Sequence, residues 1–280
     1  MMPIACTVMK AFTLRGTGLH TGEASHVTVR PRAGGGRVFL CGGMAIPALA
    51  EYVTDTRRCT TLGRDGAQVR TVEHLLAALL LAGVDHAEIE VEGPELPALD
   101  GSARAWFAAI REAGVQPLGE DAPEYRIAEP EWFAEGDSRF YLCPAETPAL
   151  FAAISFPETP AERMMAGGSL EDEEVLAQIV RARTFALESE VSALLDAGLS
   201  QGASLENAVV LTRDGYLNPH VWPREPAWHK VLDLAGDLAL TGARVRGQVI
   251  ASCGGHRGHV ALAKEIRNMQ TAKCKMQSAK

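Results

Sequence analysis

The sequence lacks several features that would assign it to familiar classes. Its six cysteines are scattered, with no Cys-x-x-Cys pair among them, which argues against a disulfide framework and a cysteine-rich zinc site. No apolar run approaches the ~20 residues of a membrane-spanning helix, and the first residues do not form a secretory signal pattern. We therefore expect reduced thiols, a cytoplasmic location and no stable membrane anchor.

Positive charge is also in short supply. The chain has 27 Lys and Arg against 35 Asp and Glu, a formal net charge of −8. This balance argues against a general nucleic-acid-binding surface, although a local basic pocket is compatible with it. An apolar content of 47% and a charged content of 22% are those of a soluble globular protein, and 280 residues suffice for one large domain or two ordinary ones.

The stretch TVEHLLAALLLAG, residues 71–83, predicts an apolar helix around which the chain is organised. Thr71 is the expected N-cap, and Gly83 is the expected stop. Glu73 and His74 stand side by side in the first turn, where burying them without partners would cost on the order of several kcal/mol. Either a metal ion compensates them, with His74 as ligand and Glu73 as general base, or Glu73 caps the helix beside a hydrogen-bonded His74.

A second apolar helix is predicted at residues 228–238, WHKVLDLAGDL. It places His229 and Asp233 four residues apart and therefore on one face. Such a pair is often a mere surface pair, but this helix is otherwise largely apolar. Together with His74, the two residues would form a three-ligand site with one open position, which is typical of catalytic zinc.

The order helix, glycine, strand occurs twice, at residues 71–91 and 228–252. This repetition predicts an α+β fold of two similar halves with the metal site between them. The polar, turn-rich stretch GEDAPE, residues 119–124, is the best candidate for the linker between the halves.

Three other stretches allow narrower predictions. RGTGLHTG, residues 15–22, lacks a phosphate-loop pattern, and we expect a tight turn that includes His20. The stripe formed by Leu187, Val191, Leu194 and Leu195 predicts a short amphipathic helix, which either packs into the core or faces a lipid. A final helix is expected from residue 260 to about 269.

Taken together, these motifs resemble the UDP-3-O-acyl-N-acetylglucosamine deacetylases, the zinc amidases of lipid A biosynthesis. The resemblance runs from about Thr13 to Glu265 and depends on eight stretches in order: RGTGLHTG, DTRRCTTL, TVEHLLAAL, PELPALDGSA, RARTF, GASLENAVVL, HKVLDLAGDL and GHVALAKEI. Any one of them would be modest support, whereas all eight in sequence are highly specific.

The resemblance implies two α+β sandwich halves, each with an insert and with the metal site at their interface. The first half would span residues 1–119, with a small β insert at about 38–69. The second would span residues 124–280, with an insert at about 184–210 that shapes an acyl-chain passage. The implied cofactor is Zn²⁺, and its ligands would be His74, His229 and Asp233.

The resemblance also assigns roles in catalysis. Glu73 would be the general base, and His259 would protonate the leaving amine with Asp237 as its carboxylate partner. Thr184 would support the oxyanion, and Lys230 would contact the polar substrate. The side chains expected along the substrate are Phe156, Phe185, Leu187, Val191 and Leu194.

Between the two histidines near the C-terminus, the sequence favours His259 as the acid. It directly precedes the apolar run Val260-Ala-Leu262, which would fix its ring, whereas His256 lies between Gly255 and Arg257. A neighbouring cation would disfavour protonation of His256.

The implied function is hydrolysis of the acetamide of UDP-3-O-acyl-N-acetylglucosamine, which releases acetate and UDP-3-O-acyl-glucosamine. The expected partner is this acylated UDP-amino-sugar, with no nucleic acid, and the expected state is a monomer. The chain departs from the family at Leu187, where an aromatic residue is usual, at Trp228, where arginine is common, and at the His256-Arg-Gly-His259 stretch. The alternatives are a zinc amidase that acts on another acylated amine and a non-catalytic zinc-binding homologue.

Overall fold

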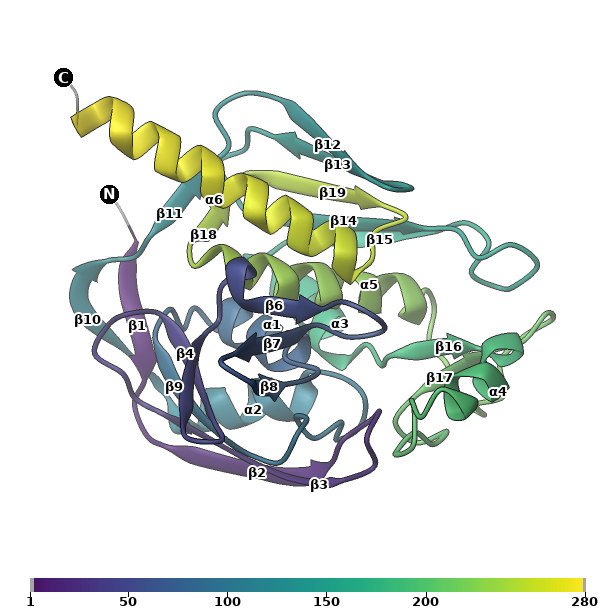
Figure 1. Ribbon diagram of the computed structural model, residues 1–280. Coiled ribbons are helices and arrows are strands. Elements are labelled where there is room, and N and C mark those ends of the chain that lie inside the picture. The colour runs from purple at the N-terminus through teal and green to yellow at the C-terminus, as the bar shows by residue number, and fades with distance from the viewer. Residues whose placement is uncertain (1–2, 279–280) are drawn as a thin grey trace.

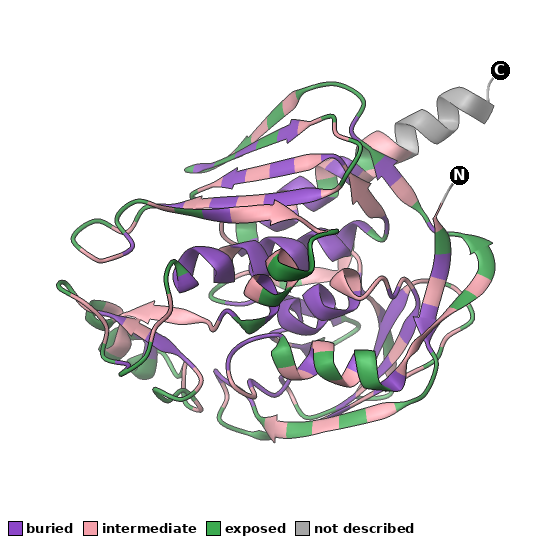
Figure 2. Cartoon of the chain, turned by 180° about the vertical axis from the view of Figure 1, so that it is seen from behind, coloured by how far each residue is buried: buried purple, intermediate pink, exposed green. Residues whose placement is uncertain are grey.

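The computed structural model describes residues 3–278, with side-chain burial described for residues 3–270. Two five-stranded sheets enclose a layer of helices (Figure 1). The inner faces of the sheets and the central helices are buried, while the outer faces are mostly half-buried or exposed (Figure 2). None of the helices in this described part of the chain combines the length and apolarity that crossing a bilayer requires.

The first sheet has the order β2-β3-β9-β4-β5, with β4 and β9 parallel and all other pairs antiparallel. Its strands are β2 (Phe12–Thr17), β3 (Ala24–Arg30), β4 (Arg37–Cys41), β5 (Met44–Pro47) and β9 (Ala87–Glu92). Alternating buried positions such as Val27 and Val29 on β3 turn one face toward the core. The helices of this half are α1 (Glu73–Leu81) and α2 (Arg104–Ala113).

The second sheet repeats this arrangement in the order β12-β13-β19-β14-β15, again with one parallel pair, β14 and β19. Its strands are β12 (Glu131–Glu135), β13 (Ser138–Cys143), β14 (Ala149–Ile154), β15 (Met164–Ser169) and β19 (Gln248–Ser252). Its helices are α3 (Glu173–Arg181), α5 (Glu225–Leu238), η2 (Ala239–Thr241) and α6 (His256–Ser278). The shared strand order confirms the predicted α+β fold of two similar halves.

Two of the smaller sheets lie outside the main sheets, one in each half. The first comprises β6 (Val53–Asp55), β7 (Thr61–Arg64) and β8 (Ala67–Val69), preceded by η1 (Ala50–Tyr52). The second comprises β16 (Phe185–Leu187) and β17 (Val209–Leu211), with α4 (Glu188–Asp196) between them. The expected start of the first insert at about residue 38 is too early, because β4 and β5 hydrogen-bond within the main sheet.

The connection between the halves is also more ordered than the composition of residues 119–124 suggests. Strand β10 (Val115–Asp121) continues into this stretch and pairs with β1 (Ile4–Val8). Strand β11 (Glu124–Arg126) then pairs in parallel with β18 (Arg244–Arg246). The predicted linker is therefore mostly strand.

The start of α1 differs from the sequence prediction. Thr71 is not the N-cap: that position is Val72, which provides no side-chain cap. The Thr71 hydroxyl instead donates to the buried carboxylate of Glu95 at 2.6 Å, and its backbone has a φ of 58°. Glu95 also accepts the backbone N–H of His20, so this carboxylate ties the start of α1 to the β2–β3 loop. Gly83, with a φ of 73°, lies two residues beyond the end of α1, as predicted.

Helices α1 and α5 pack against each other almost backbone to backbone. A Cβ atom at Gly236 would lie 2.1 Å from the carbonyl oxygen of Glu73, so only glycine permits this approach. Both helices are buried on nearly all sides. For α1, this explains why the sequence is apolar with little amphipathic character. The contact brings the polar residues of the two helices together.

Substitution Gly236→Ala should therefore separate the helices. We expect a loss of ~1–3 kcal/mol in the free energy of unfolding from overpacking, together with weakened metal binding. The control is Gly34→Ala, where the added Cβ would have its nearest neighbour at 3.7 Å and the change should stay within about 0.5 kcal/mol. Urea denaturation of both variants measures the difference; equal stability in the two would contradict the packing argument.

Candidate active site

A cavity of about 240 Å³ opens where α1 and α5 meet. Its wall combines residues from both halves and both inserts. The polar side chains on this wall include Glu73, His74, Thr184, His229, Lys230, Asp233 and His256. The structure thus assembles in one place most of the residues that the sequence singles out from distant segments.

His74, His229 and Asp233 converge at this wall, all buried, with one potential ligand atom of each within 4.8 Å of the others. His229 Nδ1 lies 3.0 Å from the Ala182 carbonyl, to which it donates. Its Nε2 therefore carries the lone pair, and it faces Asp233 Oδ1 at 3.3 Å. That oxygen has no hydrogen-bond donor among the described residues. Two buried lone-pair atoms this close repel each other unless a cation binds both, so the three residues fit a divalent metal ion.

The protonation states suit the same interpretation. Burial lowers the pKa of His74 to about 3, with a further contribution from His229, so its imidazole is neutral. Burial also lowers the pKa of His229. Burial by itself would raise the pKa of Asp233, but nearby positive charges, those of Lys230 and His256 among them, hold that pKa well below its usual range. Two neutral imidazoles and one carboxylate form a donor set typical of catalytic zinc.

Glu73 lies beside this set and is 2% exposed. One carboxylate oxygen accepts the backbone N–H of Thr60 at 3.0 Å. Burial raises the pKa of Glu73 to about 8, and the negative charges of Asp237 and Asp233 add to the increase. A carboxyl group whose pKa lies near neutrality is suited to accept and release protons.

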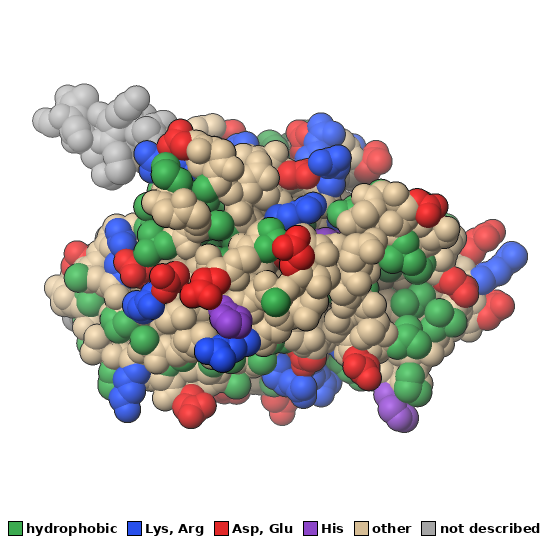
Figure 3. Space-filling view, turned by 60° about the horizontal axis from the view of Figure 1, so that its bottom comes forward, with side chains coloured by type: hydrophobic (Ala, Val, Ile, Leu, Met, Phe, Trp, Pro, Cys, Tyr) green, Lys and Arg blue, Asp and Glu red, His purple; other side chains and the backbone are tan. Residues whose placement is uncertain are grey.

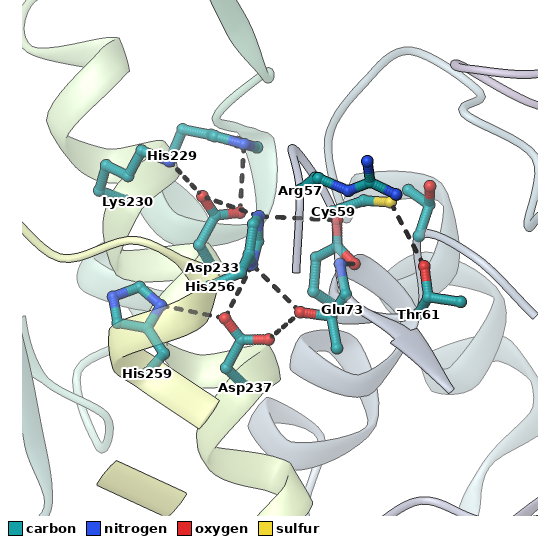
Figure 4. Close-up of polar contacts among 12 residues, drawn as sticks. Arg57, Cys59, Thr61, Glu73, His229, Lys230, Asp233, Asp237, His256 and His259 are labelled. Atoms are coloured by element: carbon teal, nitrogen blue, oxygen red, sulfur yellow. Dashed lines mark hydrogen bonds and ion pairs between the residues drawn. The ribbon is translucent and has the colours of Figure 1, made fainter. Parts of the chain in front are cut away.

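The two C-terminal histidines do not lie where the sequence argument put them. His256 is on the cavity wall, with Nε2 at 4.0 Å from Glu73 and 3.9 Å from Asp233. His259 is 1% exposed, lies on the other side of Asp237 and does not line the cavity (Figure 4). This geometry argues against His259 and for His256 as the acid.

The expected effect of Arg257 on His256 is absent for a physical reason. The Arg257 guanidinium turns away and pairs with Glu135 at 2.6 Å, and α6 already begins at His256. Although burial opposes protonation of His256, Asp237 and Asp233 raise its pKa to about 9. Burial lowers the pKa of His259. His259 is thus neutral, whereas His256, at the cavity wall, is the cation.

A second, apolar cavity of about 330 Å³ continues from the first and shares Thr184 and Phe185 with it. Its walls include Val191, Leu194 and Leu195 of α4. Hydrophobic side chains gather on the surface over this insert, at the right of Figure 3. The stripe on α4 therefore lines the second cavity, while Leu187 lines the first.

Comparison with known proteins settles the family. The model of the UDP-3-O-acyl N-acetylglycosamine deacetylase family matches residues 5–268. The chain belongs to this deacetylase family. Proteins named UDP-3-O-acyl-N-acetylglucosamine deacetylase are similar over most of their length. The one from Thermosynechococcus vestitus is 40% identical over 90% of each chain. That from Leptospira biflexa is 38% identical over 95% of this chain and 90% of its own, and that from Myxococcus xanthus is 39% identical over 93% and 85%.

Some residues of this deacetylase-family site were not singled out by sequence reasoning. His20, interpreted as part of a turn, lines both cavities, and both its ring nitrogens are buried without a hydrogen-bond partner among the described residues. Thr60 donates its backbone N–H to Glu73 and its hydroxyl to Asp237 at 2.6 Å. Both lie within motifs that carried the family resemblance, which was the available signal. Phe156 and Phe185, expected along the substrate, line the cavity with ring centroids 5.3 Å apart.

The donor set makes a direct prediction for metal content. The purified protein should hold about one zinc ion per chain, and His229→Ala or Asp233→Ala should reduce this to a small fraction because each removes one of three ligands. His220→Ala, which removes an exposed histidine near α5, is the matched control and should retain its zinc. Metal analysis after dialysis measures the content; full occupancy in both ligand variants would reject the assignment.

Proposed function

We propose that this chain hydrolyses the acetamide of UDP-3-O-acyl-N-acetylglucosamine, with zinc held by His74, His229 and Asp233. The products would be acetate and UDP-3-O-acyl-glucosamine, in a step of lipid A biosynthesis. One observation carries the proposal: a group of residues that could hold a metal ion lies beside a buried carboxyl and a histidine where an apolar cavity opens. The names of the relatives support the same substrate.

The base in this proposal is Glu73. When bound, zinc would supply Lewis-acid polarisation of the acetamide carbonyl and acidify a water molecule. Glu73, adjacent to the ligand His74, takes a proton from the attacking water. The Thr60 N–H fixes one Glu73 oxygen at 3.0 Å, so the carboxyl is oriented before substrate arrives.

His256 is the acid. Its Nδ1 donates to Asp237 at 2.8 Å, which leaves Nε2 directed toward Glu73 and the cavity. The protonated ring gives its Nε2 proton to the departing nitrogen, because an amine anion is a very poor leaving group. Positioned proton transfer of this kind contributes ~10²–10⁴ in rate.

The remaining polar groups hold the substrate. Lys230 donates to Asp233 at 2.8 Å and lies over the Phe185 ring at 5.3 Å, so its cation stays at the cavity wall, where it meets the polar part of the substrate. Thr184 lines both cavities and can donate to the oxyanion that develops on the carbonyl. The acyl chain would enter the passage beside Val191 and Leu194.

The site is complete within one chain, which supports the proposal of a monomer. The five cysteines whose side chains the structure describes are free, in keeping with a reducing, cytoplasmic setting.

The acyl passage predicts graded chain-length dependence. Removing two methylenes from the 3-O-acyl chain should lower kcat/KM because each buried methylene contributes ~0.8 kcal/mol, about fourfold. Leu194→Asn should reduce activity more on long-acyl than on short-acyl substrates. Acetate release from the acylated UDP-sugar is the measurement, with UDP-N-acetylglucosamine as the control that lacks the 3-O-acyl chain. Zinc-loaded protein that releases no acetate from the acylated UDP-sugar, but does so from another acylated amine, would indicate the alternative amidase.

The two cavity acids predict a bell-shaped pH dependence of kcat/KM. Activity should rise as pH increases through the pKa of Glu73, which must be ionised, and fall as pH increases through the raised pKa of His256, which must be protonated. His256→Gln should lose most turnover, keep its zinc and lose the alkaline limb. If an active His256→Gln enzyme kept the decrease in kcat/KM at high pH, the general acid would be another group.

A further inference from the structure

Asp237 is a buried carboxylate shared by several donors. It is 0% exposed, and Oδ1 accepts the hydroxyl of Thr60 at 2.6 Å. Oδ2 accepts two imidazole N–H groups, from His256 at 2.8 Å and from His259 at 3.0 Å (Figure 4). Because an unpaired buried carboxylate is very costly, these three donors are what allows the charge to stay there.

The role of His259 is not explained by packing alone. Its ring is 1% exposed and meets Phe140 edge to face, with centroids 5.8 Å apart. Since Nδ1 donates to Asp237, the other nitrogen carries a lone pair, and Nε2 is buried with no partner among the described residues. Leaving a buried acceptor unsatisfied costs ~1–3 kcal/mol. An apolar side chain would avoid that cost, so the gain from histidine here is its bond to Asp237.

That bond bears on His256 through the shared carboxylate. The His256 ring is held at Nδ1 by Asp237, and the direction of its Nε2 toward the cavity depends on how that carboxylate is oriented. Without His259, Oδ2 would keep only one N–H donor, and the carboxylate could rotate about its terminal torsion, which is intrinsically soft. The His256 ring would rotate with it, and a small displacement of a catalytic group is costly in rate.

We propose that His259 is a positioning residue, whose Nδ1–H locks the Asp237 carboxylate and thereby aims His256 at the leaving nitrogen. This inference rests on the proposed function, in which His256 is the acid. It assigns to His259 no contact with substrate, in keeping with its place behind Asp237.

Three substitutions at this position separate positioning from packing. In His259→Asn the amide nitrogen occupies about the place of the imidazole Nδ1, so it can still donate to Asp237. In His259→Gln the amide reaches the place of Nε2 instead, and His259→Leu has no donor. We expect His259→Asn to keep most of kcat, and the other two to lose about 10-fold to 100-fold in kcat with little change in KM or zinc content.

A spectroscopic readout on metal-free protein tests the same point without turnover. The Nδ1–H proton of His256, shielded from solvent and bonded to Asp237, should give a downfield ¹H resonance assignable by ¹⁵N-histidine labelling. We expect His259→Asn to preserve it and His259→Gln and His259→Leu to shift or broaden it. An unchanged resonance with unchanged kcat in a folded His259→Leu variant would overturn the proposal, as would equal kcat losses in the Asn and Leu variants.

Two further comparisons make the outcome unambiguous. His86→Leu removes another buried histidine, whose Nδ1 accepts the Gly36 N–H at 2.8 Å and which does not line the catalytic cavity. It should cost stability without a specific loss of kcat. If wild-type protein with bound zinc released no acetate, the proposed function would fail, whereas the His256 resonance in the metal-free variants would still decide whether His259 positions Asp237.

Discussion

The contact between α1 and α5 is the constraint on which the site depends. Because Gly236 has no side chain, the α5 backbone lies against the carbonyl of Glu73, and the polar residues of both helices face one small volume. The same contact removes these residues from water, and burial is the largest influence on the pKa of both Glu73 and His74. Packing therefore sets both the geometry and the pKa values of the site. A change that moves the helices apart would also change these pKa values.

Charge balance is the second requirement. Three buried carboxylates, Glu73, Asp233 and Asp237, lie within a few side chains of one another, and repulsion among them would be severe without compensation. Cationic His256 and the hydrogen bonds to Asp237 supply part of that compensation. A divalent ion among the predicted ligands would supply more. Packing of the apolar core around the helices offsets the electrostatic repulsion among these groups, as expected for a functional site that destabilises the fold locally.

The sequence predicts the parts of this site that local spacing controls. His229 and Asp233 share a helical face, Glu73 is adjacent to His74, and the repeated helix–strand order indicates two halves. Sequence spacing fails to predict a side chain's contacts where its partner lies far away in the chain. Glu135 draws Arg257 away from His256, and Glu95 takes the hydroxyl of Thr71 that would otherwise cap α1. His256 and His259 are only three residues apart on one helix, so spacing alone cannot tell which ring meets the cavity and which lies behind Asp237.

The division of the site between early and late segments has a consequence for biosynthesis of the protein itself. As the chain leaves the ribosome, α1 emerges with Glu73 and His74 long before α5 and α6 are made. Until then, the side of α1 that packs against α5 is uncovered, and His74 has neither of its proposed co-ligands. Such a nascent chain is a natural client for chaperones and cannot hold metal stably. The nascent chain therefore becomes active as an amidase only after α6 has been synthesised and has packed against α5.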